Sequence, residues 1–104
     1  MAVYVDSEEI RWRHRLWCHM AADSLDELHS FARRLGLKRS WFQDQASYPH
    51  YDLTVEIRER ALRLGALEAD RPMIIDRCKA LKREMAIVQG DLWPTLNLEE
   101  EERP

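Results

Sequence analysis

The chain has 104 residues, of which 45% are hydrophobic and 34% are charged, and its formal net charge at pH 7 is -3. This size and apolar content suit one domain with one core, and the acidic balance argues against a protein that coats nucleic acid non-specifically. Only two cysteines, no signal-peptide pattern and no apolar run of about 18 residues together predict a cytoplasmic protein that does not insert into a membrane.

Two strands are predicted at the start of the chain. The segment "AVYVD" (2–6) is short and rich in Val and Tyr, and "LWCHMA" (16–21) has the length and apolar content of a second strand. Alternation along that strand would place His19 on the opposite face from Cys18. Between the strands, the basic stretch "RWRHR" (11–15) is interpreted as a solvated connection rather than as a phosphate-binding patch.

The first helix is predicted from Leu25 to Leu35. Ser24 and Glu27 form a capping box, in which the serine side chain accepts from the Glu27 amide. Apolar residues then recur at helical spacing, and Gly36 is placed to end the helix in a left-handed conformation.

A third strand is predicted from Arg39 to Gln43, on its aromatic content and its position after a helix stop. Strand, helix and strand in about thirty residues indicate a right-handed βαβ unit, which makes the second and third strands parallel. The expected fold class is therefore α/β, with a small three-stranded, mostly parallel sheet in the order strand, strand, helix, strand, helix, helix.

Two further helices are expected. One runs from Thr54 to Leu64 and ends at Gly65. The longer one is entered at Asp70 and ended by Gly90. The expected organisation is a single compact domain over residues 1–90 and a C-terminal extension with an acidic tail over 91–104.

The last helix carries a narrow apolar seam. Packing of this seam on the sheet or on the second helix is favoured, and homo-oligomerisation through it is the alternative. The seam comprises Ile74, Cys78, Leu81, Met85 and Val88.

Polar residues are expected to converge at one edge of the sheet, because ligands of parallel sheets bind beyond the carboxyl ends of the strands. The first strand would bring Asp6, the second His19 and Asp23, and the third Gln43 and the loop "SYPHYD" (47–52). Each carboxylate also has a plain structural interpretation. Asp6 is more simply a turn former, and Asp23 is equally well explained as support for helix capping.

Two histidines have a carboxylate within reach. His50 and Asp52 are two residues apart, so in an extended segment both face one side and Tyr51 faces the other. Such a pair suits a general base or a phosphate orienter, although Asp52 could equally cap the following helix. His29 lies at the border of the apolar stripe of the first helix, beside Asp26, where a satisfied structural histidine is favoured.

No cofactor is indicated by motif. The histidines and cysteines lack CxxC or HxxxH spacing, so no structural zinc site is predicted. A looser Mg²⁺ site at Asp6, Asp23 or Asp52 would leave no spacing signature.

No GxGxxG or GxxxxGK loop is present either. Phosphate recognition would instead use a helix N-terminus with Arg39 and Arg58, and the aromatic side chains Trp41, Tyr48 and Tyr51 could stack on a base.

The strings "MAVYVD", "CHMAADSLDELHSFARRLGLKRSWFQ" and "PHYDLTVEIRERALRLGA" resemble a small family of bacterial and bacteriophage proteins catalogued as a domain of unknown function. The resemblance covers residues 1–66 and leaves the third helix and the acidic tail outside. It brings no established activity, but it implies which positions matter. These are His19, Asp23, Glu27, His29, Trp41, Phe42, Gln43, His50, Tyr51, Asp52 and Arg58.

Two hypotheses of different classes follow. The first is an enzyme or recognition domain for a nucleotide or nucleic-acid phosphoester. The second is a non-catalytic module, phage-derived in origin, that binds or sequesters a nucleotide or a partner protein. The expected catalytic residues are His19, His29, His50 and Asp52. The expected ligand-binding residues are Asp6, Asp23, Arg39, Trp41, Gln43, Tyr51 and Arg58.

Overall fold

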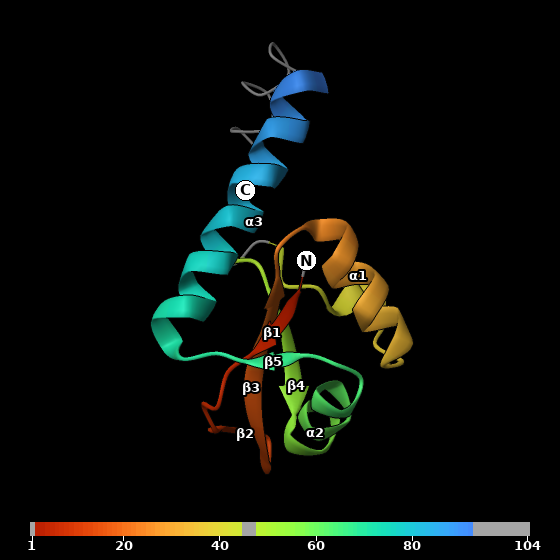
Figure 1. The fold of residues 1–104 in the computed structure, drawn as a ribbon, viewed down its shortest axis with the longest axis vertical. Coiled ribbons are helices and arrows are strands. Elements are labelled where there is room, and N and C mark those ends of the chain that lie inside the picture. Colours follow the sequence, from red (N-terminus) through yellow and green to blue (C-terminus); the bar gives the residue numbers. More distant parts are fainter. Residues whose placement is uncertain (1, 45–47, 93–104) are drawn as a thin grey trace.

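The computed structural model describes residues 2–44 and 48–92, with side chains described up to residue 87. Five strands, three α-helices and one 3₁₀ turn alternate along these ranges (Figure 1). The elements are β1 (Val3–Val5), β2 (Ile10–Trp12), β3 (Arg15–Ala22), α1 (Leu25–Arg34), η1 (Arg39–Trp41), β4 (Tyr51–Thr54), α2 (Val55–Arg63), β5 (Leu67–Glu68) and α3 (Arg71–Leu92).

The sheet is organised around β3, the longest strand. β1, β2 and β4 all pair with β3 in antiparallel fashion, and only β5 pairs in parallel, with β1. The α/β class is confirmed. The expected three-stranded, mostly parallel sheet was wrong, because the sheet has five strands and is mostly antiparallel.

The expected third strand is a turn instead. The Trp41 amide donates to the Lys38 carbonyl and the Phe42 amide to the Arg39 carbonyl, which closes η1 on itself. Backbone groups spent within one turn cannot pair with a strand, so no βαβ unit forms. Gln43 makes only an isolated bridge to His50.

One of the strands that pair with β3, β4, begins in the segment that was expected to be a loop. β4 spans Tyr51–Thr54 and alternates between buried and half-buried residues, as a sheet strand with one covered face does. Pro49 precedes it and disfavours helical backbone at Tyr48. Residues 48–52 of "SYPHYD" are thus the entry to a strand and not a plain connection, and Ser47 lies outside the described residues.

The basic stretch 11–15 is also ordered. It forms a hairpin in which β2 pairs with the start of β3. At its tip, Arg13 and His14 have φ angles of 52° and 65°, the positive values that a two-residue hairpin turn requires. The interpretation of this stretch as a connection without strands was therefore wrong.

The sheet is covered on both faces. In Figure 1, α3 lies on one side of the strands, and α1 and α2 lie on the other. The seam of α3 turns toward the sheet, since Ile74, Cys78 and Leu81 are buried, which confirms the packing that was favoured for it. This part of the seam is covered by the chain itself and offers no surface to a second copy. Val88 lies outside the described side chains.

The helix ends follow the predicted chemistry. The side chains of Ser24 and Thr54 cap α1 and α2 by accepting from the amides three residues ahead. Gly36 has a φ of 84°, which only glycine adopts without strain. The expected stop of α3 at Gly90 was wrong, because the helix continues through Gly90 to Leu92, the last described residue. None of the helices, within the part of the chain that is described, has the length and apolarity to cross a membrane.

Candidate functional site

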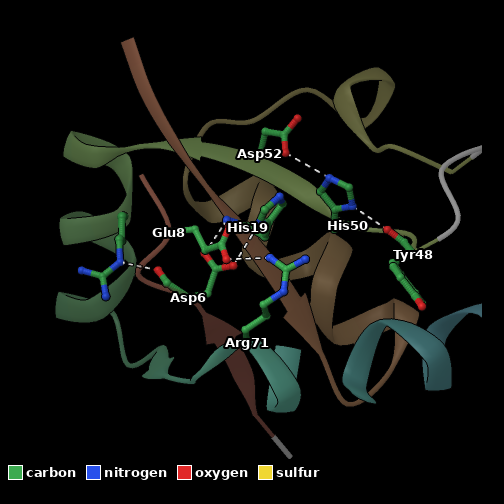
Figure 2. A network of polar contacts seen from close by, with 8 residues as sticks. Asp6, Glu8, His19, Tyr48, His50, Asp52 and Arg71 are labelled. Carbon is green, nitrogen blue, oxygen red and sulfur yellow. Dashed lines mark hydrogen bonds and ion pairs between the residues drawn. The ribbon is translucent and has the colours of Figure 1, made fainter. Parts of the chain in front are cut away.

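Four polar residues converge on the face of the sheet that α3 covers (Figure 2). His19 on β3 and Asp52 on β4 are direct cross-strand partners, so both side chains leave the same face. His50 precedes Asp52 by two residues and shares that face. Asp6 follows β1, and its amide donates to the His19 carbonyl at 3.1 Å. Convergence was expected, but antiparallel pairing produces it rather than parallel strand ends.

Asp6 and His19 form a tightly held pair. Nδ1 of His19 lies 2.8 Å from one carboxylate oxygen of Asp6, and the His19 amide donates to the other oxygen at 2.8 Å. Burial alone would raise the pKa of Asp6, which is 2% exposed, but the hydrogen bonds from His19 outweigh it and lower that pKa. The hydrogen bond to Asp6 in turn raises the pKa of His19.

His50 is held at both ring nitrogens. Its Nδ1 makes a short contact with the carbonyl oxygen of Tyr48, and its Nε2 lies 3.0 Å from Oδ1 of Asp52. A carbonyl only accepts, so Nδ1 carries the hydrogen. The His50 and His19 rings meet edge to face, with centroids 4.9 Å apart.

A small cavity of about 130 Å³ lies at this cluster. Asp6, His19 and His50 line it on the sheet side, and Ile74, Ile75, Cys78 and Arg71 of α3, together with Tyr48, complete the lining. Arg71 is 66% exposed at the rim, where its guanidinium pairs with Glu8 at 2.6 Å. A cavity of this size admits a small anion or a hydrated ion, whereas whole ligands need roughly 300 Å³ or more.

A larger pocket of about 660 Å³ lies next to the cluster. Its polar lining includes Asp52, which contacts His50 of the small cavity at 3.0 Å, so the two spaces adjoin through this pair. Three tryptophans line it, and two of them are largely exposed, Trp12 at 56% and Trp41 at 50%. The full lining is Trp12, Arg15, Trp17, Leu35, Gly36, Leu37, Ser40, Trp41, Gln43, Asp52, Leu53, Thr54 and Ile57.

The cluster has the donor atoms that a cation needs. One ligand atom each from His19, His50 and Asp52 lies within 4.8 Å of the other two. Cys78 lines the cavity floor, but burial raises the pKa of its thiol to about 11. The thiol therefore stays protonated at neutral pH, and the available donors are imidazole nitrogen and carboxylate oxygen.

Two of the expected site residues lie apart from this cluster. Asp23, four residues beyond His19, accepts from the Tyr4 hydroxyl and pairs with Arg77 at 3.1 Å. His29 lies on the opposite side of the sheet, where its Nδ1 contacts the Tyr51 hydroxyl at 2.9 Å. That placement makes His29 a satisfied histidine of the α1 packing and takes the buried Tyr51 away from any ligand.

The expected ligand-binding arginines also differ in availability. Arg58 is engaged by the chain itself, because its Nε donates to the Asp6 carbonyl at 2.7 Å and its Nη2 pairs with Glu68 at 2.8 Å. Arg39 is exposed and stacks over the Phe42 ring. Trp41 and Gln43 are the expected ligand-binding residues that line the larger pocket, together with Asp52, which was expected to be catalytic.

Sequence reasoning missed several lining residues. Arg71 was not singled out, because nothing local to its sequence points toward Asp6. Trp12 and Trp17 could have been found, since an alternating "IRW" segment near a basic turn is a hairpin signal. Their rings pack edge to face at 5.9 Å.

The chain matches, over residues 3–81, a protein family described as "Protein of unknown function (DUF4031)". This range extends beyond the resemblance over 1–66 and takes in the first half of α3, so the expectation that the third helix lies outside the family was wrong. No curated protein and no solved structure matches the chain.

Proposed function

The chain belongs to the DUF4031 family of proteins of unknown function, and we propose that it recognises a nucleotide or a related phosphoester and hydrolyses it. The observation that carries this proposal is a contact between two adjoining spaces: His50, which lines a small cavity together with His19, lies 3.0 Å from Asp52, which lines a larger pocket with three tryptophans. In this proposal the small cavity takes the phosphate of the ligand and the larger pocket takes its base.

The small cavity suits a phosphate group. Its volume of about 130 Å³ excludes a whole nucleotide. Positive charge is available from the His19 imidazole, whose pKa is raised by its bond to Asp6, and from Arg71 at the rim. Charged donors of this kind form the strongest hydrogen bonds to phosphate oxygens.

The larger pocket suits a nucleobase. Trp12 and Trp41 present exposed rings, and cationic groups lie over both, Arg13 at 4.7 Å and Lys38 at 5.7 Å from the ring centroids. A base that stacks on an aromatic side chain gains about 1 to 3 kcal/mol. These cations would also attract a phosphate-bearing ligand to this edge of the molecule.

Hydrolysis requires a water oxygen that attacks phosphorus and a group that accepts the water proton. It also requires positively charged groups next to the phosphate oxygens. The cluster combines these requirements, because Asp52 offers a carboxylate oxygen 3.0 Å from the His50 imidazole and His19 lies against the same ring. The bond from phosphorus to the ester oxygen breaks as the new bond forms, and the proton removed from the water is returned to that leaving oxygen.

Binding without turnover is the second candidate function. It is favoured by the composition of the larger pocket, whose described lining has three tryptophans and no histidine. Such a pocket could hold a nucleotide by stacking alone. The two functions share one ligand class and differ in whether that ligand is recovered intact.

A panel of nucleoside monophosphates, dinucleotides and p-nitrophenyl phosphate tests both functions. Tryptophan fluorescence reports binding, and phosphate release reports turnover. Trp41→Ala should weaken nucleotide binding by about tenfold or more, whereas His50→Ala should abolish turnover and retain binding.

The exposed Ile87 on α3 supplies the control variant Ile87→Ala, which should change neither property. Intact ligand with tight binding would favour the binding module. No binding of any phosphoester would exclude both functions.

A further inference from the structure

We propose that His19, His50 and Asp52 bind a divalent transition-metal ion of the Zn²⁺ class, with two imidazole nitrogens and one carboxylate oxygen as ligands. The role of this ion in hydrolysis rests on the proposed function. Its binding rests only on the geometry of the cluster, and each can fail without the other.

The ligand atoms are close to coordinating distance of a common point. Nε2 of His50 lies 3.0 Å from Oδ1 of Asp52. Two ligands that each lie about 2.1 Å from an ion are roughly 3.0 to 3.4 Å apart at angles between 90° and the tetrahedral angle. All three atoms lie within 4.8 Å of one another, and an inward movement of the His19 ring would bring the set to coordinating distance.

His19 is prepared as a ligand by Asp6. The carboxylate holds Nδ1 at 2.8 Å and fixes the hydrogen there, which leaves Nε2 with the lone pair. A carboxylate on the second nitrogen is the usual outer support of a metal-binding histidine, because it sets the tautomer and increases ligand basicity. Asp6 is 2% exposed, so the support is built into the core.

His50 has an outer support of the other common kind. A backbone carbonyl, that of Tyr48, takes the hydrogen of its Nδ1, and the intervening Pro49 is buried, which holds the geometry. The free lone pair of Nε2 then faces the carboxylate of Asp52. Two electron-rich atoms 3.0 Å apart repel unless a proton or a cation lies between them. His50 is therefore oriented from behind toward a positive charge shared with Asp52.

The donor set selects the class of ion. Imidazole nitrogen is a ligand of Zn²⁺, Fe²⁺ and related ions, whereas Mg²⁺ and Ca²⁺ prefer oxygen alone. Three protein ligands also leave positions open, as in catalytic metal sites, while structural zinc sites are closed by four. Asp6 bonds to His19 and is not a ligand of the ion. The proposed ligands therefore differ from those of the Mg²⁺ site that was considered at Asp6, Asp23 or Asp52.

The ion would complete the proposed phosphoester site. With three protein ligands, the ion would have a position left to take a water molecule or a phosphate oxygen. In the metal-free protein, protonated imidazoles would supply the positive charge of the cluster. In the metal-bound protein, the ion would supply it.

Titration of the chelator-treated full chain with ZnCl₂, followed by calorimetry and by elemental analysis, tests the inference without any phosphoester. One ion should bind per chain with a Kd below about 10 μM. Asp52→Asn and His50→Ala should each weaken binding at least 100-fold, and Asp6→Asn should weaken it about 10- to 100-fold by loosening His19. His14→Asn, which removes an exposed histidine outside the cluster, should bind as the parent does.

Two further measurements keep the test decisive if a variant folds poorly. Circular dichroism establishes that each variant is folded, and the Co²⁺-loaded parent should give a d–d spectrum without a thiolate charge-transfer band. Parent binding weaker than 10 μM, equal binding by Asp52→Asn and the parent, or a thiolate band would each overturn the inference. Zinc binding without phosphoester turnover would leave the ion site in place and remove the proposed hydrolysis alone.

Discussion

His19 and Asp52 face each other across the β3–β4 ladder, on the side of the sheet that α3 covers. Side chains alternate along a strand, so a shift of one residue in this pairing would send Asp52 to the opposite face. The hydrophobic pattern prevents the shift, because Cys18 and Leu53 are buried partners on the other face. The same apolar contacts that stabilise the sheet therefore assemble the polar cluster.

Asp6→Asn should destabilise the metal-free protein by about 2 kcal/mol, because the amide cannot replace a charged acceptor that is buried and bonded to His19 twice. Urea unfolding in the presence of a chelator measures the change. Glu8→Gln is the matched control, because Glu8 pairs with the exposed Arg71 and exposed pairs contribute about 1 kcal/mol or less. Equal losses in the two variants would contradict the importance of burial.

The stabilisation that His29 provides should depend on pH. Burial, followed by the nearby Arg39 charge, lowers the pKa of His29 below its unfolded value of about 6.5. The unfolded chain then binds more protons, so the contribution is present above about pH 6.5 and is lost as pH falls through the folded pKa. His19, whose pKa is raised, has the opposite effect on the pH dependence of stability. Its contribution is the same in the parent and in a His29 variant, so it cancels when their unfolding free energies are compared.

Parallel urea titrations of the parent and His29→Gln at pH 8 and pH 5 test this dependence. The difference in unfolding free energy should be larger at pH 8. A difference that grows on acidification would show that the folded protein favours the charged imidazole.

Leu81→Ala should cost about 2 to 5 kcal/mol, the range for a fully buried leucine that leaves a cavity. Ile87→Ala, at a position 63% exposed on the same helix, should stay within about 0.5 kcal/mol. Thermal unfolding at two protein concentrations provides the measurement. A large effect at Ile87 that depends on concentration would point to contact between copies at the exposed side of α3.

The hairpin tip offers a stabilising change. Arg13 and His14 both hold positive φ angles, which cost about 1 kcal/mol or more per residue for ordinary side chains. Replacing the pair by Asn-Gly, the preferred sequence of this turn, should raise stability by about 1 kcal/mol and Tm by about 4 to 8 °C. Arg11→Asn, on the exposed strand β2, should give no gain. A lower Tm for the Asn-Gly protein would exclude this turn geometry.

Local signals accounted for the helices, whereas the sheet depended on pairing that no local signal contains. Ser24 and Thr54 cap their helices as expected, since a cap is decided by residues within one turn. The segment 39–43 has strand-like composition, but the turn bonds of η1 use its amides. β5 has two residues, too few for any periodicity.

The site was partly accessible from sequence for a physical reason. His50 and Asp52 face one side because a two-residue spacing in extended backbone dictates it, and the structure gives their side chains a 3.0 Å contact. That Asp6 supports His19 depends on the strand register, and that Arg71 reaches the cavity depends on how α3 crosses the sheet. Neither relationship is encoded in a local pattern.

The position of the aromatic pocket has a consequence for how proteins on this scaffold can diversify. Trp12 lies beside an exposed two-residue tip, and Trp41 lies in a single turn outside the ladder that holds His19 and Asp52. Insertions or substitutions at the tip or in that turn would reshape the pocket and leave the strand register intact. Such changes would therefore alter the pocket without moving the cluster of His19, His50 and Asp52.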